Sequence, residues 1–129
     1  MRRVITFGTF DLLHHGHIKL LKRAKEFGDY LIVGVSSDKL NYKKKNRYAI
    51  YNEVERITIV ESLKMVDEVF LEESLELKKD YIIKYNADVL VMGDDWMGKF
   101  DYLKNICNVV YLPRTPSVST TATIEKIQN

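Results

Sequence analysis

The chain has 129 residues, of which 46% are hydrophobic and 29% are charged, and its formal net charge at pH 7 is +2. These values are typical of one globular domain, residues 1–129, that can bury a conventional core. The charge is too small to indicate a nucleic-acid partner, and no apolar run approaches the roughly 18 residues of a membrane span. No signal peptide is predicted, and the single cysteine, Cys107, excludes an intramolecular disulfide. We therefore expect a cytoplasmic protein without membrane insertion.

Apolar runs alternate with helical patterns along the whole chain. In chain order we expect a strand at 3–7, a helix at 16–27, strand 30–36, helix 52–63, strand 68–71, helix 75–85, strand 89–92, a short helix near 100–105, strand 109–112 and helix 120–127. The polar, lysine-rich stretch 37–51 is predicted to be a loop. Strands rich in Val, Ile and Leu that alternate with helices indicate a parallel sheet buried on both faces. The sequence thus predicts a single Rossmann-like α/β domain with a five-stranded parallel sheet flanked by helices.

The connection between the first strand and the first helix carries the run His14-His15-Gly16-His17. Gly8 and Gly16 allow a ligand to approach the backbone closely, because glycine has no Cβ. The start of a helix presents unpaired N–H groups and the positive end of its dipole, which attract anions. Histidines added there provide further donors for a phosphate whose charge grows during a reaction. This segment predicts a phosphate site at the first helix.

Besides the histidine segment, three later segments of the chain are informative. His14, Gly16 and His17 resemble the HxGH signature of nucleotidyltransferases, and residues 114–121 (RTPSVSTT) are similar to the Arg-Thr and Ser-Thr-Thr element of cytidylyltransferases. Residues 92–96 (MGDDW) and 98–101 (GKFD) are similar to the bacterial glycerol-3-phosphate cytidylyltransferases. Most of these segments follow predicted strands, so they are expected to face one crevice at the carboxyl end of the sheet.

The resemblance implies an enzyme that transfers CMP from CTP to sn-glycerol 3-phosphate and releases CDP-glycerol and pyrophosphate. The acceptor's phosphate would attack the α-phosphorus directly and in line, without a covalent intermediate. The family implies Mg²⁺ bound with CTP, a homodimer and a product used for teichoic acid or a related polymer. The sequence shows no dedicated protein site for a metal, because the three histidines are joined by few other ligand side chains.

The resemblance also implies roles for individual residues. Catalytic roles fall on His14, His17, Lys44 and Arg114. Nucleotide contacts fall on Thr9, Phe10, Asp11, His14, Gly16, His17, Lys64, Asp95, Arg114, Thr115, Ser119, Thr120 and Thr121. Acceptor contacts fall on Lys44, Arg56, Lys78 and Trp96. Arg56 also matches a helix arginine of the family that is thought to support the site.

Several of these residues have a second interpretation. The two motif histidines are alternatively capping or packing residues of the first helix, and Asp11 is expected to fix its loop rather than act as a base. The chain is one residue longer than the family between the lysine-rich segment and Arg56, so Lys43 or Lys45 could replace Lys44. Lys78 is alternatively a surface lysine of its helix, and Trp96 a core residue. These alternatives remain open from the sequence.

Two positions depart from the family pattern. Lys64 stands where the glycerol-phosphate enzymes have arginine, and lysine lacks the planar fork of a guanidinium. Ala122 and Thr123 stand where relatives often place a lysine after Ser-Thr-Thr. These departures leave two alternative functions open: a cytidylyltransferase for another small alcohol phosphate, or a CTP-binding regulatory module without turnover. The third alternative, an adenylyltransferase of the same superfamily, is disfavoured by the Arg-Thr and Ser-Thr-Thr element.

Overall fold

The computed structural model describes residues 1–113. The predicted helix at 120–127 and the site residues expected at 114–121 lie outside this range. The strands are β1 (Arg3–Gly8), β2 (Tyr30–Ser36), β3 (Glu68–Glu72), β4 (Val89–Gly93) and β5 (Asn108–Leu112). The helices are α1 (His15–Lys25), α2 (Asp38–Lys45), α3 (Glu53–Glu61) and α4 (Lys78–Lys84), with the short 3-10 turns η1 (Leu75–Leu77), η2 (Asp94–Trp96) and η3 (Asp101–Leu103). All five predicted strands are confirmed.

The five strands form one parallel sheet in the order β3-β2-β1-β4-β5. The chain builds outward from β1 to β3, returns to the other side of β1 and continues through β4 to β5. Strand order therefore reverses beside β1, and the loops that follow β1 and β4 diverge there. In open α/β sheets such a switch point, at the carboxyl ends of the strands, is where ligands bind.

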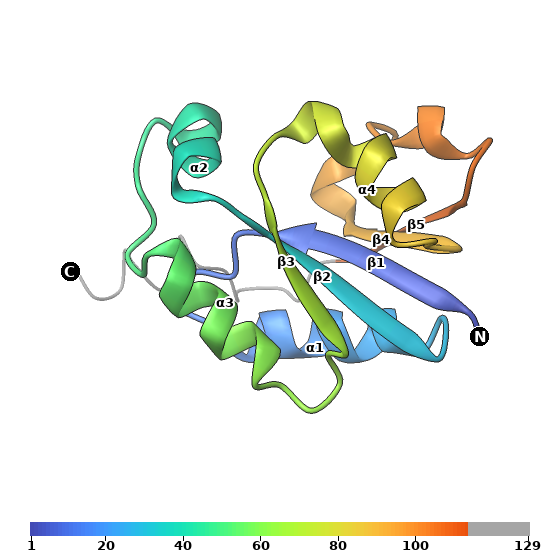
Figure 1. Cartoon of the computed structure of the whole chain (residues 1–129), viewed down its shortest axis with the longest axis horizontal. Helices are drawn as coiled ribbons and strands as arrows, with labels where there is room; N and C mark the ends of the chain where they lie inside the picture. The colour runs from blue at the N-terminus through green and yellow to red at the C-terminus, as the bar shows by residue number, and fades with distance from the viewer. Residues whose placement is uncertain (114–129) are drawn as a thin grey trace.

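Helices cover both faces of the sheet. Figure 1 shows α1 and α3 together on one face and α4 on the other. Neighbouring strand residues point to opposite faces, so Val4 packs into the core under α1 and α3 whereas Ile5 packs into the core under α4. Both side chains are fully buried. This two-sided burial is the reason that the strands are continuous apolar runs, and it confirms the predicted α/β architecture.

The prediction of an irregular loop at 37–51 is wrong for residues 38–45, which form helix α2. The hydroxyl of Ser37 caps this helix by accepting the N–H of Leu40 at 3.0 Å, and the helix ends at Asn46 in the left-handed conformation. Only Leu40 and Asn41 are buried, and most of the remaining residues are polar. The apolar face is therefore too narrow to produce a helical periodicity in the sequence.

Two smaller differences concern the predicted helices. The helix expected at 75–85 is divided into η1 and α4, and the short helix expected near 100–105 is the 3-10 turn η3. Between residues 1 and 113, no helix is both long and apolar enough to cross a bilayer.

Candidate active site

A pocket of about 300 Å³ opens at the carboxyl ends of the strands, beside the switch point. Its walls come from the loop after β1, the start of α1, helix α2, the end of β3, the start of α4 and the loop after β4. The structure brings ten predicted site residues together in these walls: Thr9, Phe10, Asp11, His14, Gly16, His17, Lys44, Lys78, Asp95 and Trp96. Residues more than 80 positions apart in the chain thus meet in one cavity.

The two motif histidines are held by hydrogen bonds at the start of α1. His14 is the N-cap residue, and its Nδ1 accepts the N–H of Gly16 at 3.0 Å. The backbone N–H of His14 in turn donates to Nδ1 of His17 at 3.1 Å, and the two rings stack with centroids 4.0 Å apart. A neutral imidazole that accepts at Nδ1 carries its proton at Nε2. The capping interpretation is therefore correct, and capping also makes Nε2 of each ring a donor.

The charge state of His17 follows from its surroundings. Burial, and secondly the neighbouring His14, lower the pKa of His17 to about 4. The ring is therefore neutral at pH 7, with a hydrogen-bond donor at Nε2 and an acceptor at Nδ1. Such a group can stabilise a charged oxygen by donating a hydrogen bond, without giving up its proton.

The loop after β1 has a strained backbone. Phe10 and Leu12 have φ angles of 53° and 47°, in the left-handed region that residues other than glycine rarely adopt. A Cβ at Gly8 would lie 2.8 Å from the ring of Phe10, so glycine is needed there to seat this ring. Gly8 also lines the pocket, so this packing reason stands beside the predicted close approach of a ligand.

Asp11 fixes this loop to the segment before α3. Its carboxylate accepts the backbone N–H groups of Ile50 at 2.7 Å and Tyr51 at 2.9 Å. These bonds hold the connection from α2 to α3 against the loop that carries the histidines. The expectation that Asp11 orders the loop is confirmed.

Lysine side chains from α2 enter the pocket. Nζ of Lys44 donates to the hydroxyl of Ser36 at 3.1 Å, and Nζ of Lys45 donates to the hydroxyl of Thr9 at 3.2 Å. Burial lowers the pKa of Lys44 to about 8 and also lowers the pKa of Lys45. Lys43 is exposed and is not part of the pocket wall. Among the three alternatives left by the sequence, the structure favours Lys44, with Lys45 beside it.

Lys78 is the first residue of α4, and its side chain is only 1% exposed. Its Nζ lies 2.6 Å from Oε2 of Glu72 and 4.1 Å from the centre of the Phe7 ring. The alternative of a surface lysine is therefore wrong. Burial lowers the pKa of Lys78, although the carboxylate of Glu72 acts in the opposite direction.

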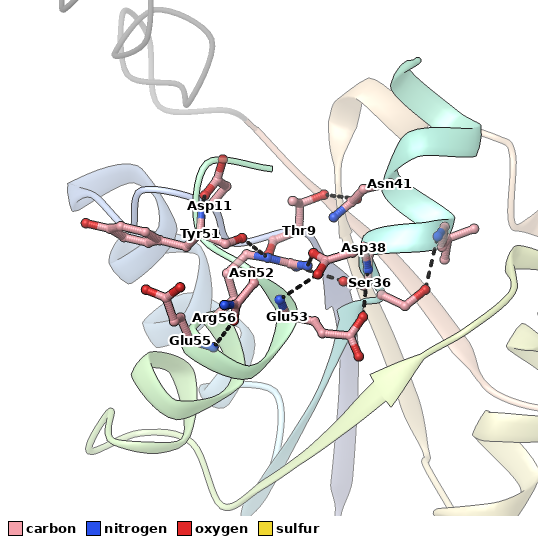
Figure 2. Close-up of polar contacts among 12 residues, drawn as sticks. Thr9, Asp11, Ser36, Asp38, Asn41, Tyr51, Asn52, Glu53, Glu55 and Arg56 are labelled. Atoms are coloured by element: carbon pink, nitrogen blue, oxygen red, sulfur yellow. Dashed lines mark hydrogen bonds and ion pairs between the residues drawn. The ribbon is translucent and has the colours of Figure 1, made fainter. Parts of the chain in front are cut away.

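Arg56 lies behind the pocket wall at the centre of a polar network (Figure 2). Its side chain is fully buried, and its guanidinium donates to the carbonyl groups of Thr9, Ser36 and Tyr51 at 2.7–2.9 Å. It also donates to Oδ1 of Asp38 at 2.8 Å. All three guanidinium nitrogens thus bind protein groups. The structure places Arg56 as a support of the pocket and not at the acceptor-contact position expected from the sequence.

Other predicted residues differ in their placement. Lys64 is exposed in the connection that leads to the amino end of β3. It is not among the residues that line the pocket, so the predicted nucleotide contact of Lys64 is not found within residues 1–113. Asp95 is exposed at the pocket edge. Trp96 lines the pocket and also packs on the core beside Phe100, with ring centroids 5.3 Å apart. Both interpretations of Trp96 therefore apply.

Sequence reasoning missed Asn41 and Glu72, which both line the pocket. Asn41 is 1% exposed, and its Oδ1 accepts a hydrogen bond from the hydroxyl of Thr9 at 2.9 Å. Its Nδ2 has no hydrogen-bond partner among the described residues. No sequence pattern indicated Asn41, because it lies in the segment predicted to be a loop. Glu72 ends β3, a position where ligand-facing residues are expected.

Nowhere in residues 1–113 do three or more His, Cys, Asp or Glu side chains form a group that could hold a metal ion. Mg²⁺ is often bound by only one or two carboxylates together with substrate phosphates and water. Asp95, exposed in the pocket wall, provides a carboxylate of this kind. The residues present therefore fit a cation that arrives with a nucleotide.

The switch-point pocket, the two Nε2 donors and the lysines define a phosphate-binding α/β domain suited to nucleotides. The cytidylyltransferase-like family model matches residues 5–126, and the chain belongs to this family. It is 56% identical over 127 residues to glycerol-3-phosphate cytidylyltransferase of Bacillus subtilis (strain 168), covering 98% of both chains. It is 35% identical to FAD synthase of Thermococcus sibiricus (strain DSM 12597 / MM 739), covering 97% of this chain and 91% of that protein.

The fold is also similar to a solved structure, the lipopolysaccharide core biosynthesis protein from Thermoplasma volcanium GSS1. The TM-score is 0.76 at 28% identity, over 89% of this chain and 98% of that chain. The family model and the Bacillus subtilis relative confirm the resemblance to cytidylyltransferases.

Proposed function

We propose that this protein transfers CMP from CTP to sn-glycerol 3-phosphate and releases CDP-glycerol and pyrophosphate. The 56% identity to a glycerol-3-phosphate cytidylyltransferase over almost the whole chain supports this function. The observation that carries it is the pocket itself, where neutral His17 and the ammonium groups of Lys44 and Lys78 line one cavity at the start of α1. These groups suit two phosphate-bearing substrates.

The reaction is a direct displacement. A phosphate oxygen of the acceptor forms a bond to the α-phosphorus of CTP, while the bond from that phosphorus to the oxygen of pyrophosphate breaks. The Nε2–H donors of His14 and His17 stabilise the charge that develops on the α-phosphate in this step. No protein base is required, because the acceptor's phosphate is already ionised at neutral pH. The protein therefore acts by positioning and electrostatic stabilisation.

The acceptor's phosphate is bound by Lys44 and Lys78, which reach the pocket from α2 and α4. Thr9 and Phe10 offer backbone N–H groups of the loop after β1 to the triphosphate. Arg114 and the hydroxyl residues Thr115, Ser119, Thr120 and Thr121 complete this role from the segment outside the described residues. Mg²⁺, bound with CTP, supplies charge neutralisation of the triphosphate.

The cellular setting is part of the same proposal. We propose that the enzyme is a cytoplasmic homodimer whose product feeds teichoic acid or a related polymer. Gel filtration with light scattering tests the dimer, for which the expected mass is twice the monomer's 15.1 kDa.

The choice of substrates is tested by measuring pyrophosphate release with CTP or ATP and a panel of alcohol phosphates. We expect release with CTP and glycerol 3-phosphate only. Release with a different alcohol phosphate would keep the mechanism and change the acceptor. Release with ATP in place of CTP would support an adenylyltransferase. No pyrophosphate release with any pair of substrates would support a regulatory nucleotide-binding module. Lys64, the sequence reason for an altered acceptor, lies away from the pocket, which favours the first outcome.

Lys44 gives the reaction an upper pH limit. Because its pKa is lowered to about 8, the ammonium is charged below that pH and neutral above it. We expect kcat/KM for glycerol 3-phosphate to fall as the pH rises through about 8, since this ratio reports groups of the free enzyme. Lys44→Arg stays charged in this range, so its profile should lack the fall. An identical fall in both proteins would contradict this role.

Lys78→Met should mainly weaken binding of the acceptor. Loss of a charge-assisted contact to the phosphate is expected to raise the KM for glycerol 3-phosphate by about tenfold or more, with the KM for CTP changed by less than about twofold. Lys79→Met is the matched control, because Lys79 is the exposed neighbour of Lys78 on α4. Steady-state kinetics with each substrate varied in turn measure both constants. Equal KM values in the two variants would remove Lys78 from the acceptor site.

A further inference from the structure

Glu72 connects two of the lysines that line the pocket. It is the last residue of β3, and its side chain is 1% exposed. Oε2 lies 2.6 Å from Nζ of Lys78. Oε1 lies 3.5 Å from the hydroxyl of Ser36, which shares its one proton between this carboxylate and the carbonyl of Gly8 at 3.3 Å. That hydroxyl oxygen in turn accepts from Nζ of Lys44 at 3.1 Å. One chain of polar contacts thus runs from α2 to α4 across the ends of β2 and β3.

A buried carboxylate in the wall of an anion pocket requires an explanation. It repels a phosphate and loses hydration, so it is retained only where it is paired. The positive charges that face Lys44 are Lys45, Lys78 and Arg56, and Glu72 is the carboxylate that opposes them. Lys78 also faces Glu72. Without this carboxylate, the lysines would repel one another in a partly dehydrated site.

We propose that Glu72 is a positioning residue for the acceptor, which holds the ammonium groups of Lys78 and, through Ser36, of Lys44 in place and in their charged form. Both ammonium groups can then bind the acceptor's phosphate, Lys44 from α2 and Lys78 from α4. This inference rests on the function proposed above, because it assigns the acceptor to the same pocket.

The proposal has a consequence for the pH dependence. Burial lowers the pKa of both lysines, and the negative charge of Glu72 acts against burial in each case. Removing that charge should lower both pKa values further. The ammonium groups would then lose their protons at a lower pH, and binding of the acceptor would weaken earlier as the pH rises.

Glu72→Gln tests this directly, because it keeps the shape and an acceptor oxygen but removes the charge. We expect the KM for glycerol 3-phosphate to rise about tenfold near pH 8 and less near pH 6.5, with the KM for CTP changed by less than about twofold. The upper limb of the acceptor's pH profile should shift down by roughly one unit. Glu73→Gln, the same change at the exposed neighbour, should match the wild type, and Glu72→Asp, which keeps the charge, should keep the wild-type pH limit.

An unchanged acceptor KM and pH profile in folded Glu72→Gln would overturn the inference, as would an equal rise in the KM for CTP. If the wild type shows no turnover with CTP and glycerol 3-phosphate, the proposed function fails, and a readout without turnover decides the inference. NMR titration of lysines labelled with ¹³C measures the pKa of Lys44 and Lys78 in the wild type, Glu72→Gln and Glu72→Asp. Lower values in the Gln variant support the role of Glu72, whereas unchanged values refute it.

Discussion

Replacing His17 by alanine should lower kcat by roughly 10²-fold or more, the scale expected when a preorganised transition-state donor is lost. The ring is neutral, and Nδ1 is already bound to the N–H of His14, so the missing group is the Nε2 donor. Loss of the capping contact should lower the free energy of unfolding by only about 1 kcal/mol. Binding of CTP should largely survive. Single-turnover kinetics and a CTP titration measure the two effects separately.

His15→Ala provides the matched control. His15 is the exposed neighbour in the same motif and does not line the pocket, so its kcat should equal that of the wild type. His17→Gln should recover part of the lost rate, because its amide can donate from a position near that of Nε2. If His17→Ala turns over within a few-fold of His15→Ala, the ring is only a capping residue.

Replacing Arg56 by methionine should strongly destabilise the fold. It leaves the carbonyl groups of Thr9, Ser36 and Tyr51 without this donor, and it removes the charged partner of Asp38. Loss of one member of a buried ion pair costs about 3–5 kcal/mol, and the lower end applies here, because the side chain of Asp38 is 30% exposed. We expect the free energy of unfolding to fall by about 3 kcal/mol and Tm by roughly 10 °C.

Denaturant and thermal unfolding of Arg56→Met measure this effect. Lys79→Met removes the same charge from an exposed position on α4 and should leave Tm within about 2 °C of the wild type. Arg56→Lys should be intermediate, since an ammonium cannot satisfy four acceptors in the geometry of the guanidinium. A Tm for Arg56→Met close to that of Lys79→Met would show that the network in Figure 2 contributes little to stability.

The sheet was predictable because its central strands are buried on both faces. Residues such as Val4 and Ile5 pack into different cores, which requires the continuous apolar runs that the sequence shows. The first helix and its histidines were equally predictable, since the residues that begin a helix lie within a few positions of one another in the sequence. Helix α2 was not predictable, because Leu40 and Asn41 are its only buried residues. The helix depends instead on the Ser37 cap and on the pocket that it borders.

The parts of the site that depend on long-range contacts were also hidden. Arg56 was identified from the resemblance to the family, but its contacts with Thr9 and Ser36 depend on how α3 packs against the sheet. The pairing of Glu72 with Lys78 requires the turn from β3 through η1 into α4, and no spacing rule indicates it. The close contact of Gly8 is with the ring of Phe10, whose left-handed backbone no sequence pattern indicated. Sequence patterns predicted which residues matter, whereas the structure defined how several of them act.

The proposed reaction transfers CMP from CTP to glycerol 3-phosphate in one direct step. The most direct measurement is ³¹P NMR of the wild-type protein with CTP, Mg²⁺ and glycerol 3-phosphate that carries ¹⁸O in its phosphate. The expected result is CDP-glycerol with the label retained at the new bridge between the phosphorus atoms, together with unlabelled pyrophosphate. Unchanged CTP and glycerol 3-phosphate, or CMP formed without CDP-glycerol, would contradict the proposed reaction.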